Sequence, residues 1–174
     1  PTILPNNPLS TAGSTTVTVN DPNHGRSTGD AVRFRSVVSY VGGVSPIIFM
    51  LETTLASDLT DSATTLTLSD ASAFPTSGYI VVNPGANDSE TIKYTGKSSN
   101  DLTGLTRGSS APTYNLTPLT TTASAHSSGV QVRGSYSITK VDADSYTFTL
   151  ASAASTTETG GGFPIFAGPV NARA

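Results

Sequence analysis

The chain of 174 residues has no cysteine, no tryptophan and a single methionine. Without cysteine there is no disulfide bond and no metal site with thiolate ligands. Only two histidines are present, so groups for acid–base chemistry are few. Charged residues make up 12% of the chain, about half the usual share. Small modules that lack covalent staples must be stabilised by β packing, by each other or by neighbouring subunits.

Basic clusters and long apolar runs are also missing. The nine Lys and Arg residues are scattered, and the formal net charge is −3. A nucleic-acid groove needs a concentrated positive stripe, so we expect no nucleic-acid partner. The apolar run at 44–51 contains Pro46 and is far shorter than the ~20 residues of a membrane span. We therefore expect no membrane partner, and the first residues show no signal-peptide pattern.

The sequence is instead rich in Ser and Thr, with 16 Gly, 11 Pro and short runs of alternating character. Val, Ile, Thr, Tyr and Phe recur in these runs, and such residues favour strands. Sustained helical periodicity is not seen. The fold class predicted from this pattern is all-β. Strands are expected at 14–20, 31–38, 64–69, 79–82, 90–95, 130–133, 136–141, 145–150 and, as a last short strand, 163–166.

Two pairs of these strands are predicted to form hairpins. Strands 79–82 and 90–95 flank a cluster of Asn, Pro, Gly and Asp, which are turn-forming residues. Strands 136–141 and 145–150 flank the acidic turn Asp142-Ala143-Asp144. Two alternating runs around a short turn are typical of a β-hairpin.

One set of motifs is divided between the two ends of the chain. The motifs are His24-Gly25, Ser27-Thr28-Gly29-Asp30, Val32, Phe34 and Val41-Gly42-Gly43-Val44, then Tyr136-Ser137-Ile138-Thr139 and Val141-Asp142-Ala143-Asp144-Ser145-Tyr146-Thr147-Phe148. Together they resemble a small β module of bacteriophage tail and neck proteins, one likened to a β domain of ubiquitin-activating enzymes. In that module the Gly-Gly precedes the hairpin almost directly, whereas a long segment intervenes here. If the halves close into one fold, Phe34 shares a core with Tyr136 or Phe148.

The intervening segment carries a second set of motifs. They are Phe74-Pro75-Thr76-Ser77-Gly78, Glu90-Thr91-Ile92-Lys93-Tyr94-Thr95-Gly96, Leu102-Thr103-Gly104-Leu105-Thr106-Arg107-Gly108, Ala125-His126 and Gly129. These resemble another structural module of phage virions, although the stretch 109–124 is longer here than in that module. We expect 109–122, rich in Ser, Thr and Pro, to be a long surface loop.

The two resemblances imply that one β module is inserted into another. We predict two small modules, each barrel-like or sandwich-like. The outer module comprises residues 1–50 and 134–174 and has extended terminal arms, and the inserted module comprises residues 51–133. The segment 1–13 has three prolines and is expected to be either a loose arm or a strap across a partner subunit.

The same resemblances imply a non-enzymatic structural component of a phage virion, attached at the tail, neck or baseplate. Its location would be the virion, after assembly in the host cytoplasm. Its expected partners are other virion proteins and copies of itself, met through edge-to-edge β contacts and polar interfaces. Two alternatives remain open: a capsid decoration (cement) protein, and a module that binds a host-surface glycan.

The candidate reactive groups each have a simpler structural interpretation. His24 and His126 lie at turns that lead into strands, where an imidazole can cap the turn through backbone hydrogen bonds. Asp142 and Asp144 have carboxylates that Ca²⁺ could use, but turn capping by Asp is the favoured interpretation. We therefore predict no catalytic residue, no metal site and no cofactor.

Three side chains are predicted as contacts for a partner or a glycan. Arg107 can bind an anion or a partner, although pairing with Glu90 across the hairpin is the favoured interpretation. Tyr94 and Tyr114 can stack on sugar rings. The sequence has no cluster of aromatic and acidic residues, so glycan binding carries less weight than assembly.

Overall fold

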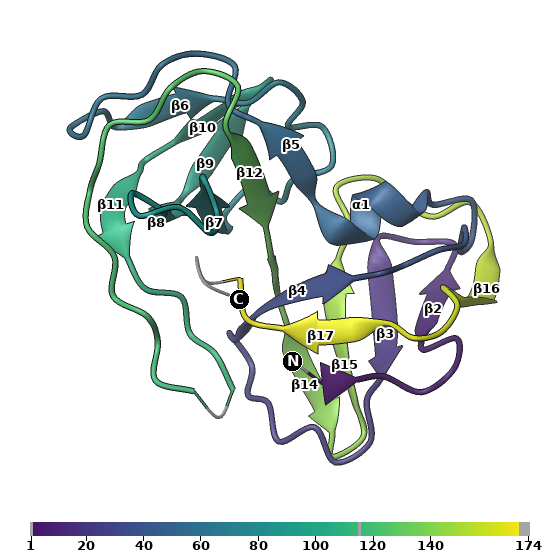
Figure 1. Ribbon diagram of the computed structural model, residues 1–174. Helices are drawn as coiled ribbons and strands as arrows, with labels where there is room; N and C mark the ends of the chain where they lie inside the picture. Colours follow the sequence, from purple (N-terminus) through teal and green to yellow (C-terminus); the bar gives the residue numbers. More distant parts are fainter. Residues whose placement is uncertain (1, 115, 171–174) are drawn as a thin grey trace.

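The computed structural model of the protein describes residues 2–114 and 116–170 (Figure 1). This part of the chain is all-β, as the sequence predicts, and its strands form four antiparallel sheets. The only α-helix within these residues is α1 (Pro46–Met50). It begins at a proline, whose fixed φ suits the first helical turn, and it is followed by Leu51 in the left-handed conformation.

Two of the sheets are built from the ends of the chain. A four-stranded sheet has the order β1 (Thr2–Ile3), β17 (Phe166–Gly168), β4 (Ala31–Arg35) and β13 (Tyr136–Ser137). A five-stranded sheet has the order β14 (Thr139–Asp142), β15 (Ser145–Thr149), β3 (Thr16–Asn20), β2 (Leu9–Ala12) and β16 (Thr157–Gly160). The hairpin predicted around the acidic turn is confirmed, because β14 pairs with β15.

The other two sheets are built from the middle of the chain. A five-stranded sheet has the order β11 (Thr106–Ser109), β8 (Glu90–Tyr94), β7 (Gly78–Val82), β12 (Gln131–Gly134) and β5 (Glu52–Thr54). A three-stranded sheet has the order β6 (Thr65–Thr67), β10 (Asp101–Thr103) and β9 (Gly96–Ser98). The pairing of β7 with β8 confirms the other predicted hairpin. The strands thus sort into sheets by their position in the chain, and Gly134, assigned to the outer module from the sequence, belongs to β12.

One large hydrophobic core runs through both groups of sheets, and a smaller cluster of Ala31, Val81, Ala111 and Val170 lies apart from it. The ring of Phe148 lies 5.2 Å from that of Phe34 and 4.3 Å from that of Tyr136, the contact expected if the two ends of the chain close into one fold. The core continues past Gly134 to Phe74. A Cβ atom at Gly134 would lie 2.7 Å from the Phe74 ring. Strand β12 can therefore pass this close to the ring only because residue 134 is a glycine, which has no side chain. The two groups of sheets therefore share one interior.

The N-terminal segment is not a free arm within the described residues. Leu4 and Leu9 are buried in the protein's own core, and the Leu4 amide donates to the Ile165 carbonyl at 2.8 Å. Strand β2 pairs with both β3 and β16. The expectation of an N-terminal arm, loose or lying on a partner, is wrong because Leu4, before Pro5, and Leu9, after Pro8, complete this core. Residues 171–174 of the predicted C-terminal arm lie outside the described residues.

Two predicted strands end differently in the structure. The segment 136–141 is divided at buried Ile138, so that β13 and β14 enter different sheets. The last strand, expected at 163–166, forms instead at Phe166–Gly168, because its partner β4 pairs with those residues. Strand β16 was not predicted from the sequence.

The segment that follows β11 returns to the outer sheets (Figure 1). The Pro112 carbonyl accepts a hydrogen bond from the Ala31 amide at 2.9 Å. Further along, the Tyr114 ring covers Gly25, where a Cβ atom would lie 2.6 Å from the ring. The first part of the predicted surface loop thus ties the middle of the chain to its N-terminal part.

Candidate functional site

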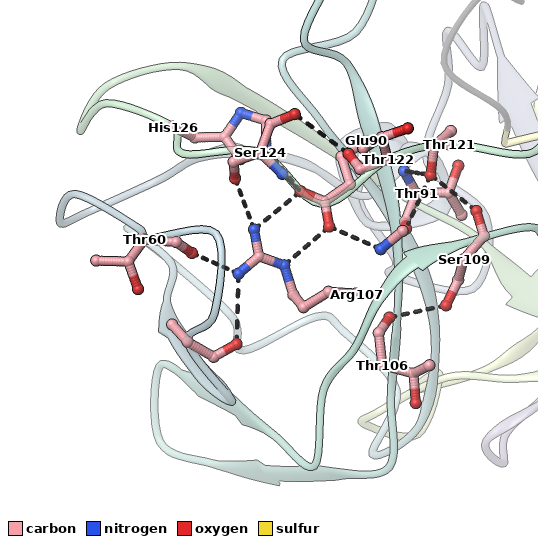
Figure 2. A network of polar contacts seen from close by, with 12 residues as sticks. Thr60, Glu90, Thr91, Thr106, Arg107, Ser109, Thr121, Thr122, Ser124 and His126 are labelled. Carbon is pink, nitrogen blue, oxygen red and sulfur yellow. Dashed lines mark hydrogen bonds and ion pairs between the residues drawn. The ribbon is translucent and has the colours of Figure 1, made fainter.

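Glu90, at the start of β8, is fully buried and lies at the centre of a polar cluster (Figure 2). Its Oε1 atom accepts hydrogen bonds from Arg107 Nη2 at 2.9 Å, the Ser124 amide at 3.0 Å and His126 Nε2 at 2.9 Å. Its Oε2 atom accepts from Arg107 Nε at 2.8 Å and the Gly108 amide at 2.9 Å. These five donors fill the acceptor positions that a carboxylate offers.

Arg107 lies on β11, the neighbour of β8, and reaches Glu90 across the pair of strands. Its Nη1 atom donates to the carbonyls of Thr60 and Ala63, and its Nη2 atom donates to the Ser124 carbonyl at 2.7 Å. The predicted pairing of Arg107 with Glu90 is confirmed. The guanidinium is 10% exposed and fully used inside the protein, so it is not free to bind an external anion.

His126 is the third charged or titratable member of the cluster. Its ring is fully buried, and Nε2 carries the proton, because the Glu90 carboxylate can only accept. Its Nδ1 atom has no hydrogen-bond partner within residues 2–114 and 116–170, and lies 3.7 Å from Asp88 Oδ2. The prediction that His126 caps a turn through the backbone is wrong, since the buried carboxylate takes its proton-bearing nitrogen.

The electrostatics of Glu90 result from two opposing effects. Burial by itself would raise the pKa of the carboxyl group, because it disfavours the charged form. The hydrogen bonds from His126, Arg107 and the two backbone amides outweigh burial and lower the pKa to about 2. Glu90 is therefore ionised throughout the neutral and mildly acidic range.

The cluster holds backbone segments together. Through Glu90 and Arg107 it fixes the carbonyls at 60 and 63, the amide at 108, and both polar groups of the backbone at 124. Across the described ranges, no group of three His, Cys, Asp or Glu side chains is placed to hold a metal ion. The geometry is that of a rigid internal anchor.

A second buried cluster lies in the outer sheets. Asp21 Oδ2 accepts a hydrogen bond from the Tyr146 hydroxyl at 2.9 Å and lies 3.6 Å from Arg26 Nε. Burial raises the pKa of Tyr146, and the Asp21 charge adds to this effect. His24 Nδ1 accepts from the Arg26 amide at 2.9 Å, so its Nε2 donates, with the Asp142 carbonyl at 2.7 Å. The prediction that His24 caps a turn is confirmed.

The acidic turns also follow the simpler interpretation. Asp142 Oδ1 accepts from the Asp144 amide at 2.8 Å and from the Ser145 hydroxyl at 2.9 Å. These bonds lower the pKa of Asp142, the Asp144 amide having the largest effect. The carboxylate therefore closes the β14–β15 turn.

Tyr94 is enclosed in the core and presents no ring face to solvent. It is 1% exposed, and its hydroxyl donates to the Pro75 carbonyl at 3.0 Å. Burial raises the pKa of this hydroxyl. The placement removes Tyr94 from the predicted glycan contacts, because a sugar must reach the face of an aromatic ring to stack on it.

Tyr114 keeps a partly exposed ring, with 37% of the residue accessible. The Arg26 guanidinium lies 5.5 Å from the centre of this ring, on top of it. The two residues line a shallow recess of about 180 Å³ together with Thr2, Thr113, Leu116, Gly168 and Pro169. Of the three predicted contact residues, Tyr114 is the one with a substantially exposed side chain.

Sequence reasoning missed the central part that Glu90 takes in its cluster. The sequence suggests Glu90 as a partner for Arg107, or as the carboxylate that a metal site joining the two histidines would need, but not as a buried centre, since a glutamate in a strand is ordinarily exposed. Glu90 lies directly opposite Val82 in the predicted hairpin, and the next two residues of its strand are also buried. This position is the feature that could have indicated a buried glutamate.

No protein-family model, curated protein or solved structure matches the chain. The resemblance to phage virion modules therefore rests on the sequence motifs alone. In the described ranges no helix has the length and apolar character needed to cross a membrane.

Proposed function

We propose that the protein is a non-enzymatic structural component of a phage virion, attached at the tail, neck or baseplate. One observation carries the proposal: the buried charged side chains are directed inward, onto the protein's own backbone. The hydrogen bonds of Glu90, Arg107 and His126 connect these side chains to one another and to loop backbone. A subunit that must keep its shape under assembly contacts benefits from such internal anchoring.

The mode of contact differs from the edge-to-edge pairing expected from the sequence. The amide of Lys140 in edge strand β14 donates to Thr28 Oγ1 at 3.0 Å, and Gly29 pairs with Ile138 just before it. At the opposite edge, Glu158 in β16 accepts from the Gly42 amide at 2.8 Å. Because turns cover parts of both edges, we propose that contacts with other virion proteins and with copies of the chain use exposed faces instead.

The test is to find where the chain resides in particles. Virions from a lysate that expresses the chain are purified on a density gradient, separated into heads and tails, and analysed by quantitative mass spectrometry. The proposal predicts a fixed copy number per particle in the tail fraction. A chain found only on heads would support the capsid decoration protein, and particles that lack the chain altogether would exclude both assembly roles.

The recess beside Tyr114 favours a second candidate, binding of a host-surface glycan. The partly exposed Tyr114 ring offers a surface on which a sugar can pack, while Arg26, which lies over the ring, is itself buried. Binding to a glycan array that is lost in Tyr114→Ala and kept in Tyr40→Ala, a second exposed tyrosine, would support this function. An array with no binding above background would exclude it.

A further inference from the structure

Two segments of the outer sheets run side by side and antiparallel beyond the end of β4 (Figure 1). Arg35 pairs with Phe166, and the Val38 amide donates to the Gly161 carbonyl at 3.1 Å. At the far end, the Gly42 amide donates to Glu158 Oε1. We name residues 35–42 and 158–166 the paired ribbon.

The middle of the paired ribbon exposes three large apolar side chains. Val38 is 68% exposed, Tyr40 64% and Phe163 59%. The two segments that carry them are in contact here, because a Cβ atom at Gly162 would lie 2.4 Å from Val38 Cγ2, and one at Gly160 would lie 3.7 Å from the Tyr40 carbonyl oxygen. Large apolar side chains that gather on a surface are typical of a contact site.

Buried residues flank the exposed side chains in both segments of the ribbon. Val37 and Val41 are buried on either side of Val38 and Tyr40, and Ile165 is buried two residues after Phe163. These three buried side chains hold the two segments against the core while the residues between them face solvent.

Charge is placed at the two ends of the ribbon and nowhere between them. The segments 36–51 and 159–170 contain no charged residue. Arg35 lies at one end, its guanidinium 5.2 Å from the centre of the Phe166 ring, and forms no ion pair with any described residue. Glu158 lies at the other end and is exposed. The ribbon thus has a positive end, an apolar middle and a negative end.

We propose that the paired ribbon joins two copies of this chain around a twofold axis. A rotation of a half-turn about an axis through the apolar middle places Arg35 of each copy opposite Glu158 of the other. It also packs Val38, Tyr40 and Phe163 against their symmetry mates. A pattern that is positive, apolar and negative in sequence is complementary to itself under this rotation, which is the requirement for an isologous contact.

A second copy fits this face better than a charged partner. An acidic or basic ligand would meet one end of the ribbon and be repelled by the other, and would lose hydration over the apolar middle. The contact is small beside the ~1,600 Å² of a standard interface, so we expect a dimer that forms and separates with concentration. The inference rests on the proposed assembly role and names the surface that this role would use.

The test is a charge-reversal cycle followed by sedimentation velocity over a concentration series at low salt. The wild-type chain of 17.7 kDa is expected to shift toward twice that mass as concentration rises. Arg35→Glu and Glu158→Arg should each weaken dimerisation by about tenfold or more, since each places like charges together at both ends of the contact. The double variant should restore dimerisation to near the wild-type level.

The controls separate this contact from loss of folding. Lys140→Glu reverses a charge at the opposite edge of the same sheet and should leave the dimer unchanged. Tyr40→Ser removes an exposed side chain, so it should keep the melting temperature and weaken the dimer. The proposal would be overturned by a chain that is monomeric at all concentrations. It would also be overturned if dimerisation were unchanged by the two charge reversals and by Tyr40→Ser.

The proposed interface and the proposed function can fail separately. A dimer governed by the reversals, together with particles that lack the chain, would keep the interface and remove the virion role. A monomeric chain that is nevertheless found in tails would keep the virion role and remove the interface.

Discussion

Within the described residues, two acid–arginine pairs have both side chains at most 10% exposed, and they differ in how many hydrogen bonds they form. Glu90 and Arg107 meet through two hydrogen bonds, and three further donors reach the same carboxylate. Asp21 and Arg26 lie 3.6 Å apart, and Arg26 Nε has no hydrogen-bond partner within the described ranges. The first pair anchors several loops, whereas the second is bonded chiefly through the Tyr146 hydroxyl and the Ala167 carbonyl.

This difference shows where each pair obtains its stabilisation. A buried charge is tolerated only when hydrogen bonds replace the water that it has lost. The Glu90 pair receives these bonds from the backbone of β11 at Gly108 and of two loops, around residues 60–63 and at 124, so its loss should release these segments together. The Asp21 pair has fewer bonds to lose, so its removal should have a smaller and more local effect.

The largest expected effect is that of Glu90→Gln. The substitution keeps the size of the side chain but leaves the Arg107 guanidinium buried without its counter-charge. We expect the free energy of unfolding to fall by about 3–5 kcal/mol, measured by urea titration. Asp61→Asn, at an exposed position, is the control and should change it by less than about 0.5 kcal/mol. An equal effect of both variants would show that the cluster does not anchor the fold.

The next effect is a dependence of stability on acid pH. The pKa of Glu90 in the folded protein is about 2 against a usual 4.5, so its stabilisation is present above pH 4.5 and is lost as the pH falls through 2. The loss amounts to about 3 kcal/mol, from about 1.4 kcal/mol for each pKa unit. Unfolding of wild type and Glu90→Gln at a series of pH values should show the two curves converging below pH 4.5. Parallel curves would contradict the low pKa.

Asp21→Asn should have a smaller effect than Glu90→Gln. The amide oxygen of the asparagine can still accept a hydrogen bond from the Tyr146 hydroxyl. The ion pair that is lost, between Asp21 and Arg26, has an N–O distance of 3.6 Å. We expect a loss of about 1–3 kcal/mol in the same urea titration. A loss larger than that of Glu90→Gln would reverse the comparison between the two clusters.

The smallest effect is expected for Tyr146→Phe, which removes only the hydroxyl that binds Asp21. The ring keeps its edge-to-face contact with His24 at 5.0 Å. A cost of about 1 kcal/mol is expected, as for the loss of a single hydrogen bond. Tyr94→Phe, which loses a bond to a carbonyl and not to a carboxylate, provides the matched comparison. A smaller cost at Tyr146 than at Tyr94 would show that the Asp21 charge does not strengthen its bond.

The strands that could be predicted from the sequence are those with apolar residues at every second position. Strands β3 and β15 alternate between buried and exposed side chains over their whole length, and both were predicted. Strand β16 has three exposed residues in succession, so no alternation marks it. Its position is set by pairing with β2, a contact between residues far apart in the chain.

The candidate site could be predicted only in part for a related reason. The pairing of Arg107 with Glu90 follows from their places on adjacent strands. The donation from His126 and from the amide of Ser124 depends on a loop whose path is not encoded in local periodicity. The burial of Tyr94 was likewise invisible, because a tyrosine in an alternating strand can face either side.

The first and last strands of the described chain are neighbours, with Thr2 opposite Ala167. Tension applied to the two ends would therefore fall first on the short β1–β17 ladder, which would peel open one bond at a time. Residues 52–134 form their own sheets and lie outside this path. They would stay folded while the β1–β17 hydrogen bonds break, because the applied force does not pass through them.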